Sequence, residues 1–230
     1  MSSRSIAAAA ALLSTMSPGL SWADAPDTTA PSPSASAVGE AQYDWQIALA
    51  LGYAFPLGAA EAGAHVADTT LGAVPVRLQV GRRVSPRFVV ELGLAWGPTL
   101  PTLCATAGEC FGSLGADLQL TLGARARLLE SGPWSTHAAV AAGWEWLSTS
   151  IEDEDASSTR RYHGPLLLAA EITGERTLGS RWQLGPVLAG GLGTFVHNSL
   201  EAPGIDRGGS PDGAGVHGWL TLSLRLAAGI

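Results

Sequence analysis

The feature that most constrains this chain is a period-two alternation of side chains that begins near residue 44 and recurs to the C-terminus. Between Asp44 and Phe55 the odd positions carry bulky apolar residues, whereas the even positions carry Asp, Gln, Ala and Gly. Successive side chains of a β-strand point to opposite faces, so this pattern predicts a strand with one bulky face and one small or polar face. It predicts eight strands, at residues 44–55, 74–80, 88–96, 114–128, 134–146, 166–177, 182–196 and 216–230.

Short and long connections alternate between these strands. The short ones, at residues 84–87, 130–133 and 178–181, contain the Gly, Pro and Ser that are typical of tight hairpin turns. The long ones run over residues 56–73, 97–112, 147–163 and 197–215. The alternation predicts an antiparallel up-and-down β-barrel, with short turns at one end and four long loops at the other.

The volume of the bulky face decides which way it points. The bulky residues number roughly 38, too many for the interior of an eight-stranded barrel, which is just wide enough for its own side chains. They must face outward, and an apolar exterior on a closed barrel suits lipid, where every backbone group must be paired. The ionisable residues of the other face then line the lumen: Asp44, Arg77, Glu91, Asp117, Arg125, Arg127, Glu145, Glu171, Glu175 and Arg225.

Ions at membrane depth are costly unless they are paired, so we expect a salt-bridge network in the lumen. A proton or ion conduit is the alternative, but eight strands leave little open bore, and we expect no open pore.

Aromatic residues gather at the ends of the predicted strands. Trp45, Trp134 and Trp182 begin odd-numbered strands, and a second set ends them: Tyr53, Phe55, Trp96, Trp144 and Trp146. Two aromatic girdles at the two membrane interfaces are typical of membrane barrels. The alternative is a set of ordinary core aromatics in a soluble sandwich, which does not explain their position at strand ends.

Charge and hydropathy exclude other classes of protein. Charged residues make up only 14% of the chain, yet no apolar run approaches the roughly 18 to 20 residues of a membrane helix. The chain has no Lys, a net charge of −7 and a pI near 5.1, so it lacks the positive field that a nucleic-acid partner requires.

The N-terminus has the features of an export signal. One arginine, Arg4, precedes an apolar stretch, and residues 23–25 have the small-x-small form of a cleavage site. We therefore expect residues 1–25 to be a signal peptide. Residues 26–42 are rich in Pro, Ser, Ala and Thr without periodicity, which predicts a flexible lead-in, and residues 43–230 form the barrel.

These features together resemble the small eight-stranded outer-membrane barrels of Gram-negative bacteria, such as the OmpA transmembrane domain and OmpX. The last strand also resembles the C-terminal signal read by the barrel assembly machinery, although it ends in Ile rather than Phe or Trp: Leu220, Leu222, Leu224, Leu226, Ala228 and Ile230. The resemblance implies outer-membrane localisation, contact with lipids including lipopolysaccharide, and assembly by that machinery, and we expect a monomer. It implies that the termini and short turns lie in the periplasm and the long loops outside.

Two features of the implied outer loops follow. Cys104 and Cys110 lie in the second loop, in a compartment where disulfides persist, so we expect them to be bridged rather than to bind a metal. Residues 152–155 of the third loop are all acidic and lack the glycine and spacing of a calcium loop, which favours a solvated loop.

Three histidines form the one constellation with metal-binding chemistry. If the strands at 166–177 and 182–196 pair about their turn, His163 and His197 lie almost opposite each other at the outer rim. The parity of their positions in the alternating pattern places the side chains of both histidines inward, together with that of His217. Three imidazoles at one mouth of the barrel could bind zinc or copper. The sequence favours the alternative of unconnected rim histidines, and we assign no metal and no cofactor.

Enzymatic activity has little support in the sequence. There is no G-x-S-x-G motif, and parity predicts no outward-facing Ser and His pair of the kind a lipid-deacylating barrel needs. We therefore expect a structural or surface-interaction role through the extracellular loops. The alternatives are a lipid-modifying outer-membrane enzyme and a soluble exported barrel of lipocalin type.

Overall fold

The computed structural model describes residues 43–101, 114–153, 156–211, 213 and 215–230. The predicted signal peptide (1–25) and lead-in (26–42) lie outside the described residues, as do Cys104 and Cys110. No helix among the described residues is long and apolar enough to cross a membrane.

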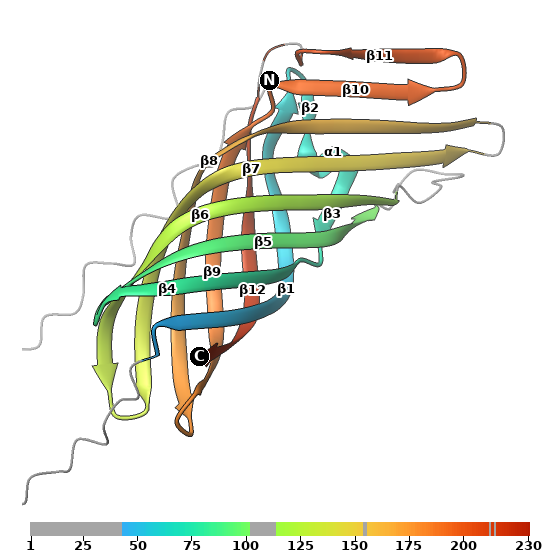
Figure 1. Cartoon of the computed structure of the whole chain (residues 1–230). Coiled ribbons are helices and arrows are strands. Elements are labelled where there is room, and N and C mark those ends of the chain that lie inside the picture. Colours follow the sequence, from blue (N-terminus) through green and yellow to red (C-terminus); the bar gives the residue numbers. More distant parts are fainter. Residues whose placement is uncertain (1–42, 102–113, 154–155, 212, 214) are drawn as a thin grey trace, which may run out of the picture. The chain divides into compact units, whose positions relative to one another are not determined.

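The described chain forms one antiparallel ring of strands, which confirms the predicted barrel (Figure 1). Each strand of the ring pairs with the next along the chain, and the last pairs with the first. All eight predicted strands are present. They are β1 (Trp45–Glu61), β4 (Val76–Ser85), β5 (Phe88–Pro101), β6 (Leu114–Ser131), β7 (Trp134–Asp153), β8 (Ala156–Leu178), β9 (Trp182–Thr194) and β12 (Val216–Gly229).

Five further elements lie in two of the long connections. Between β1 and β4 are β2 (Ala64–His65), the single-turn helix α1 (Val66–Thr69) and β3 (Thr70–Ala73). Between β9 and β12 are β10 (His197–Ala202) and β11 (Ile205–Gly209), which form a hairpin. β10 pairs with the outer part of β8, so this hairpin adds to the edge of the sheet beyond the ring.

The third long connection is mostly strand rather than loop. β7 and β8 continue to within two residues of each other, and together with β10 and β11 they extend the sheet past the barrel (Figure 1). We call residues 147–153, 156–163, β10 and β11 the sheet extension. Its Ser- and Thr-rich segments, such as 148–150 and 157–159, have no apolar alternation, which explains why hydrophobic periodicity did not mark them as strands.

The short turns lie at the end of the barrel that holds both termini of the ring. The backbone amide of Trp45 donates to the Ile230 carbonyl there, and the β6–β7 and β8–β9 turns lie at the same end. Gly132 and Gly179 in these turns have φ of 58° and 69°, a left-handed conformation that glycine adopts without steric cost.

The two faces of the wall differ as the volume argument predicts. Leu49, Leu122 and Leu224 point outward and are more than half exposed, whereas Ala48 and Ala50 point inward and are buried. A β-bulge at Leu167 interrupts the alternation in β8, because Leu166 opposes Gly193 while Leu168 opposes Leu192. One extra residue reverses which parity faces inward, so even positions point inward before the bulge and odd positions after it.

Candidate functional site

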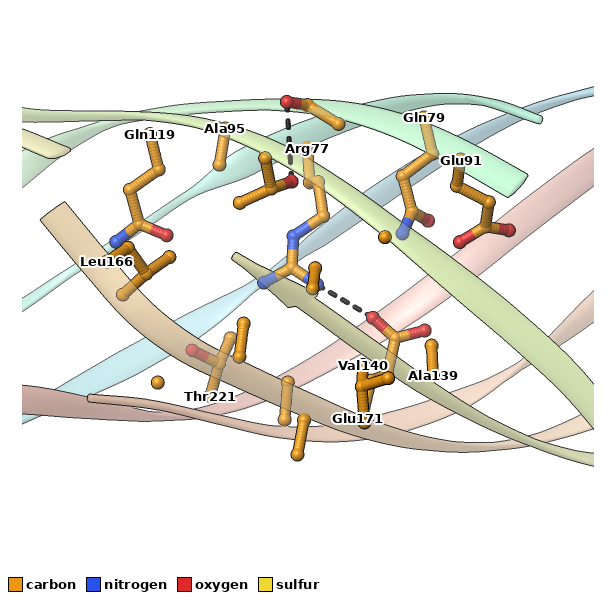
Figure 2. Close-up of a pocket in the computed structure, with 18 of the residues that line it drawn as sticks. Arg77, Gln79, Glu91, Ala95, Gln119, Ala139, Val140, Leu166, Glu171 and Thr221 are labelled. Carbon is orange, nitrogen blue, oxygen red and sulfur yellow. Dashed lines mark hydrogen bonds and ion pairs between the residues drawn. The ribbon is translucent and has the colours of Figure 1, made fainter. Parts of the chain in front are cut away.

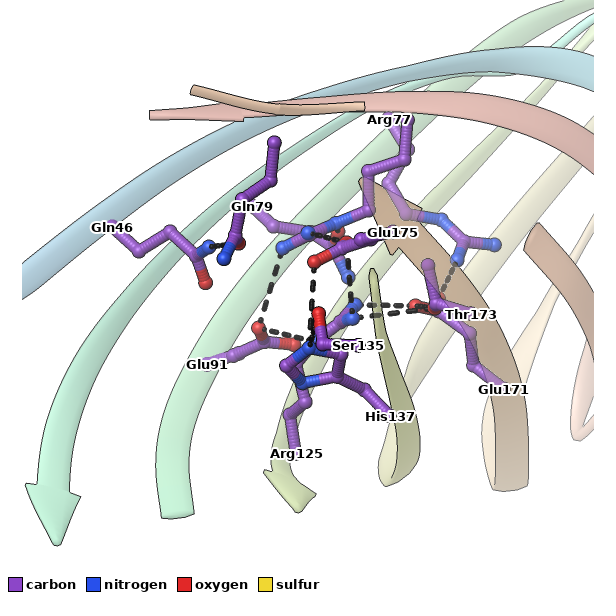
Figure 3. A network of polar contacts seen from close by, with 12 residues as sticks. Gln46, Arg77, Gln79, Glu91, Arg125, Ser135, His137, Glu171, Thr173 and Glu175 are labelled. Carbon is purple, nitrogen blue, oxygen red and sulfur yellow. Dashed lines mark hydrogen bonds and ion pairs between the residues drawn. The ribbon is translucent and has the colours of Figure 1, made fainter. Parts of the chain in front are cut away.

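Three arginines and three glutamates form a charged layer across the barrel interior, which we call the arginine layer. Its members come from five strands: Arg77 (β4), Glu91 (β5), Arg125 (β6), Glu171 and Glu175 (β8), and Arg225 (β12). Figure 3 shows five of these side chains converging in the barrel interior: Arg77, Glu91, Arg125, Glu171 and Glu175.

Arg125 lies at the centre of this layer. Its Nε is 2.8 Å from Glu91 Oε1, its Nη2 donates to Glu171, and its Nη1 lies 3.2 Å from the Thr173 hydroxyl and 3.6 Å from Glu175. The side chain is only 2% exposed, so these carboxylates replace its water of hydration. A buried guanidinium in this position is stable because its donors meet charged acceptors.

The other two arginines complete the layer. Arg77 Nη1 is 2.8 Å from Glu171 Oε2, so Glu171 bridges two arginines. Arg225 donates through Nη1 to Glu175, and its Nε lies 2.9 Å from Gln79 Oε1. Three positive charges thus meet three negative charges in the plane of the barrel.

A second polar layer, nearer the sheet extension, contains no arginine. We call it the carboxylate layer: Asp117 (β6), Glu145 (β7), His217 and Trp219 (both β12). Glu145 is fully buried and accepts hydrogen bonds from His217 Nε2 at 2.8 Å and from Trp219 Nε1 at 2.7 Å. The Asp117 carboxyl is buried near Glu145 and accepts a hydrogen bond from Gln119 Nε2 at 2.8 Å.

Aromatic packing closes the barrel above the carboxylate layer. The His217 ring stacks on Phe195 at 3.8 Å with an interplanar angle of 6°, and Phe195 in turn packs on Tyr162 at 5.1 Å. Phe195, Tyr162 and Trp219 belong to one buried cluster with Val66 of α1. The helix and the inner face of the sheet extension therefore cover this end of the lumen.

A cavity of about 60 Å³ lies between the two layers. Figure 2 shows Arg77, Glu91 and Glu171 on its lining, with Gln119 and Leu166 also bordering the space. A space of this size holds only a few water molecules.

The structure places the predicted lumen residues in four positions. Six form the arginine layer, and Asp117 and Glu145 form the carboxylate layer. Arg127 lies at the short-turn rim, where it bonds Glu130 and the Pro86 carbonyl. The prediction for Asp44 is wrong, because this residue is exposed in a bend ahead of β1. Parity places a side chain on a face but does not tell where the lumen ends.

The aromatic residues lie towards the two ends of the outer wall. Trp45, Trp134 and Trp182 are about half exposed near the short turns. Near the other end, three aromatic residues are exposed: Phe55, Trp96 and Trp146. Two more are half-buried there: Tyr53 and Trp144. Arginines stack on two of the tryptophans near the short turns, Arg82 on Trp45 at 5.8 Å and Arg176 on Trp134 at 6.0 Å.

The inward position that parity gave to all three histidines is confirmed only for His217, which is buried. His163 and His197 are cross-strand partners, as expected, and their rings stack at 4.8 Å. Both point outward, however, while His217 lies inside the barrel. The bulge at Leu167 reverses the parity of β8 at His163, and the break at residues 195–196 does the same for His197. Among the described residues, no group of three or more His, Cys, Asp or Glu is placed to hold a metal ion.

The outward histidines instead border a groove on the outside of the wall, which we call the His–Trp groove. It has a volume of about 420 Å³. Its lining includes Trp96, Leu118, Trp146, Arg161, His163, His197 and Ser199. His197 and Ser199 lie two residues apart on this outward face of β10, a placement that the alternation of the sequence did not predict.

Sequence reasoning missed this groove because it treated residues 147–163 and 197–215 as loops. A signal was present: residues 197, 199 and 201 are His, Ser and Glu, an alternation that a strand places on one face. Without apolar partners on the other face, that alternation is too weak to identify a strand.

Comparison with known proteins shows the same architecture. The structure is similar to that of a major outer membrane protein from Thermus thermophilus, with a TM-score of 0.51 and 10% identity over 80% of this chain and 99% of that one. It is also similar to Neisserial surface protein A, with a TM-score of 0.48 and 9% identity over 81% of this chain and 97% of that one. The attachment invasion locus protein Ail of Yersinia pestis matches with a TM-score of 0.43 and 13% identity over 80% of this chain and 99% of that one.

No family model and no curated protein sequence matches this chain. The likeness to the Thermus protein, at this identity, concerns the fold alone. Together with the closed antiparallel ring, it identifies the architecture as an eight-stranded barrel of the outer-membrane type.

Proposed function

We propose that this chain is an outer-membrane barrel protein with a closed lumen that acts by surface interaction on the extracellular side. The observation that carries the proposal is the contrast between the two faces of one closed wall. The outer face is a continuous apolar surface, and the inner face is filled with paired charges.

The apolar wall supports membrane embedding. Exposed Leu, Val, Ile and Trp side chains follow every strand of the ring, and a soluble protein rarely exposes so large a contiguous apolar surface. A lipocalin-like protein in water needs a polar exterior, so this wall argues against that alternative. Within the described residues the ring closes on itself, so its strands pair on both sides, as lipid requires.

The filled interior supports a closed lumen. The arginine layer spans the barrel, and the aromatic cluster around Phe195 and Trp219 fills the end beneath the sheet extension. An ion that crossed would have to displace the buried ion pairs of the arginine layer and the packed aromatic side chains beneath the sheet extension. We therefore assign no conductance.

The sheet extension supports a surface role. It places residues 156–163, β10 and β11 beyond the wall as an ordered platform, on the side opposite the short turns (Figure 1). Segments positioned by a rigid scaffold are the usual place for binding functions. We propose that this side faces outward, that outer-membrane lipids including lipopolysaccharide surround the wall, and that the barrel assembly machinery inserts the chain as a monomer.

Fractionation of cells that express the full chain tests membrane embedding. We expect recovery in the outer-membrane fraction only with detergent, and a heat-modifiable shift on gels. Recovery in the soluble periplasmic pool would contradict the proposal. In planar bilayers we expect no unit conductance from the wild type, and stable channels of defined conductance would contradict the closed lumen.

Modification of outer-membrane lipids is the second candidate function, and a specific observation favours it. His197 and Ser199 share one face of β10 and border a groove that opens on the apolar wall. A serine nucleophile needs a nearby base, and histidine is the commonest one. Mass spectrometry of lipid A from cells with the wild type or with Ser199→Ala tests it. A mass change that depends on Ser199 would support this function, and identical spectra would exclude it.

A further inference from the structure

The His–Trp groove is built on rows of residues that lie side by side across five strands. Cross-strand pairing joins His197 of β10 to His163 of β8, then to Trp146 of β7, Leu118 of β6 and Trp96 of β5. This row begins with two imidazoles and ends with a tryptophan that is 53% exposed on the barrel wall. Its apolar part is continuous with the surface that faces lipid.

The next row towards the sheet extension is polar. Ser199 pairs with Arg161, which pairs with Ser148. The groove therefore changes over one pair of residues from aromatic and apolar walls to hydroxyl and guanidinium groups. An occupant that satisfies both rows has an apolar part and a polar head, in that order along the strands.

The polar groups of the groove favour an acidic head. Arg161 reaches Glu201 through Nη1, while a guanidinium has five N–H donors in all. The His163 ring stacks on His197 and lies 6.0 Å from Trp144, and its Nδ1 is buried without a hydrogen-bond partner among the described residues. Ser199 adds a hydroxyl donor. Donors of this kind around an arginine suit phosphate oxygens, which accept bidentate hydrogen bonds.

The geometry does not suit a metal ion. The two imidazoles are stacked face to face with an interplanar angle of 29°, so their ring edges do not converge on one point between them. Tetrahedral zinc requires ligand atoms that point at a common centre.

We propose that the His–Trp groove binds a phosphorylated amphiphile of the outer leaflet. Its acyl chain lies against Trp96, Leu118 and Trp146, and its phosphate lies against Arg161, His163 and Ser199. The inference rests on the membrane location proposed above and deepens it, because it names a lipid chemistry and the residues that recognise it. Phosphatidic acid and monophosphoryl lipid A share this chemistry, and the experiment distinguishes them.

Native mass spectrometry of the full chain, refolded in detergent micelles, tests the proposal. The probes are dioleoyl phosphatidic acid, monophosphoryl lipid A and dioleoyl phosphatidylcholine at equal concentration. We expect the wild type to retain one phosphate-monoester lipid about tenfold more strongly than phosphatidylcholine, a difference well above experimental scatter. Preference for either monoester supports the proposal and identifies the source.

The variant pair makes the test specific. Arg161→Ala combined with His163→Ala removes the guanidinium and imidazole donors, retains the Ser199 hydroxyl and leaves the barrel interior untouched, and we expect it to lose the preference. Arg176→Ala is the matched control, because Arg176 is also an exposed arginine beside a tryptophan, but it lies near the short turns. We expect the control to bind like the wild type.

Three results would overturn the proposal: no preference over phosphatidylcholine, equal loss in the control, or full competition by inorganic phosphate, which would indicate a small-ion site. A heat-modifiable shift shows that each variant is folded before binding is measured. Binding in micelles is measured independently of where the chain is found in the cell. Recovery of the chain in the soluble pool would therefore contradict the membrane function alone, and loss of the lipid preference would contradict the lipid-binding proposal alone.

Discussion

The two polar layers of the barrel interior bury acids in different ways. In the arginine layer, each of the three glutamates lies within 3.6 Å of at least one arginine nitrogen. In the carboxylate layer, Glu145 and Asp117 are buried near each other, and their hydrogen-bond donors are an imidazole, an indole and an amide. Both layers are buried, but only the first balances charge with charge.

The two layers therefore contribute to stability in different ways. Removing one partner of a buried ion pair leaves an uncompensated charge, so the arginine layer is sensitive to the loss of any member. The carboxylate layer depends on hydrogen bonds and on the packing of Phe195 and Trp219. It already places two carboxyl groups near each other with no arginine among its members. The same acid-to-amide substitution should therefore have unequal effects in the two layers.

Arg125→Met should have the largest effect. It removes the cation shared by Glu91, Glu171 and Glu175, and we expect a loss of about 3–5 kcal/mol in the free energy of unfolding. Reversible urea unfolding in lipid vesicles measures this loss. The exposed Arg176→Ala serves as control and should change stability by less than about 0.5 kcal/mol. Equal effects of the two variants would contradict the role of the arginine layer.

Glu171→Gln should have the next largest effect. The amide keeps the shape of the side chain but replaces the charged acceptor of Arg77 and Arg125. Hydrogen bonds to charged groups contribute about 1.5–3 kcal/mol, and we expect a loss in that range. A variant as stable as the wild type would show that the layer does not require charge balance.

Trp219→Phe should cost about 1–2 kcal/mol, because it leaves Glu145 Oε1 without its indole donor in a buried site. Urea unfolding measures the loss, and single-channel recording shows whether the lumen stays closed. We expect no conductance, since the arginine layer is intact. Open channels would place the barrier in the carboxylate layer instead.

Asp117→Asn should have the smallest effect, within about 0.5 kcal/mol of the wild type in the same unfolding measurement. It removes one of two neighbouring buried carboxyls, and the amide can still accept the hydrogen bond from Gln119. A loss as large as that of Glu171→Gln would erase the distinction between the layers.

The prediction of the fold from the sequence succeeded where apolar alternation is strong. The strand at 44–55 and the last strand have bulky residues at every second position. Burial of these residues against lipid therefore specifies both that the segments are strands and which of their faces points outward. It failed at the sheet extension, where Ser and Thr replace the apolar residues. It also failed for Asp44, which follows the parity of β1 but lies beyond the end of the lumen.

The candidate sites were predictable only in part. Arg77, Glu91, Arg125, Glu171 and Arg225 are inward by parity alone, and their mutual contacts follow from a narrow lumen. Which acid meets which arginine depends on the stagger of neighbouring strands, which no local pattern encodes. The His–Trp groove was not predictable, because the bulge at Leu167 places His163 and Glu171 on opposite faces although both are at odd-numbered positions.

The sequence by itself determined the wall: its strands, its alternation of turns and loops, and the apolar face that points outward. These follow from a repeating local choice between large apolar and small or polar residues. The tertiary structure alone decided the division of the lumen into two layers and the outward position of His163 and His197. For His163 the physical reason is one inserted residue, Leu167, which reverses the facing of the side chains beyond it in β8, and for His197 it is the break at residues 195–196. Both irregularities are visible only against the neighbouring strands.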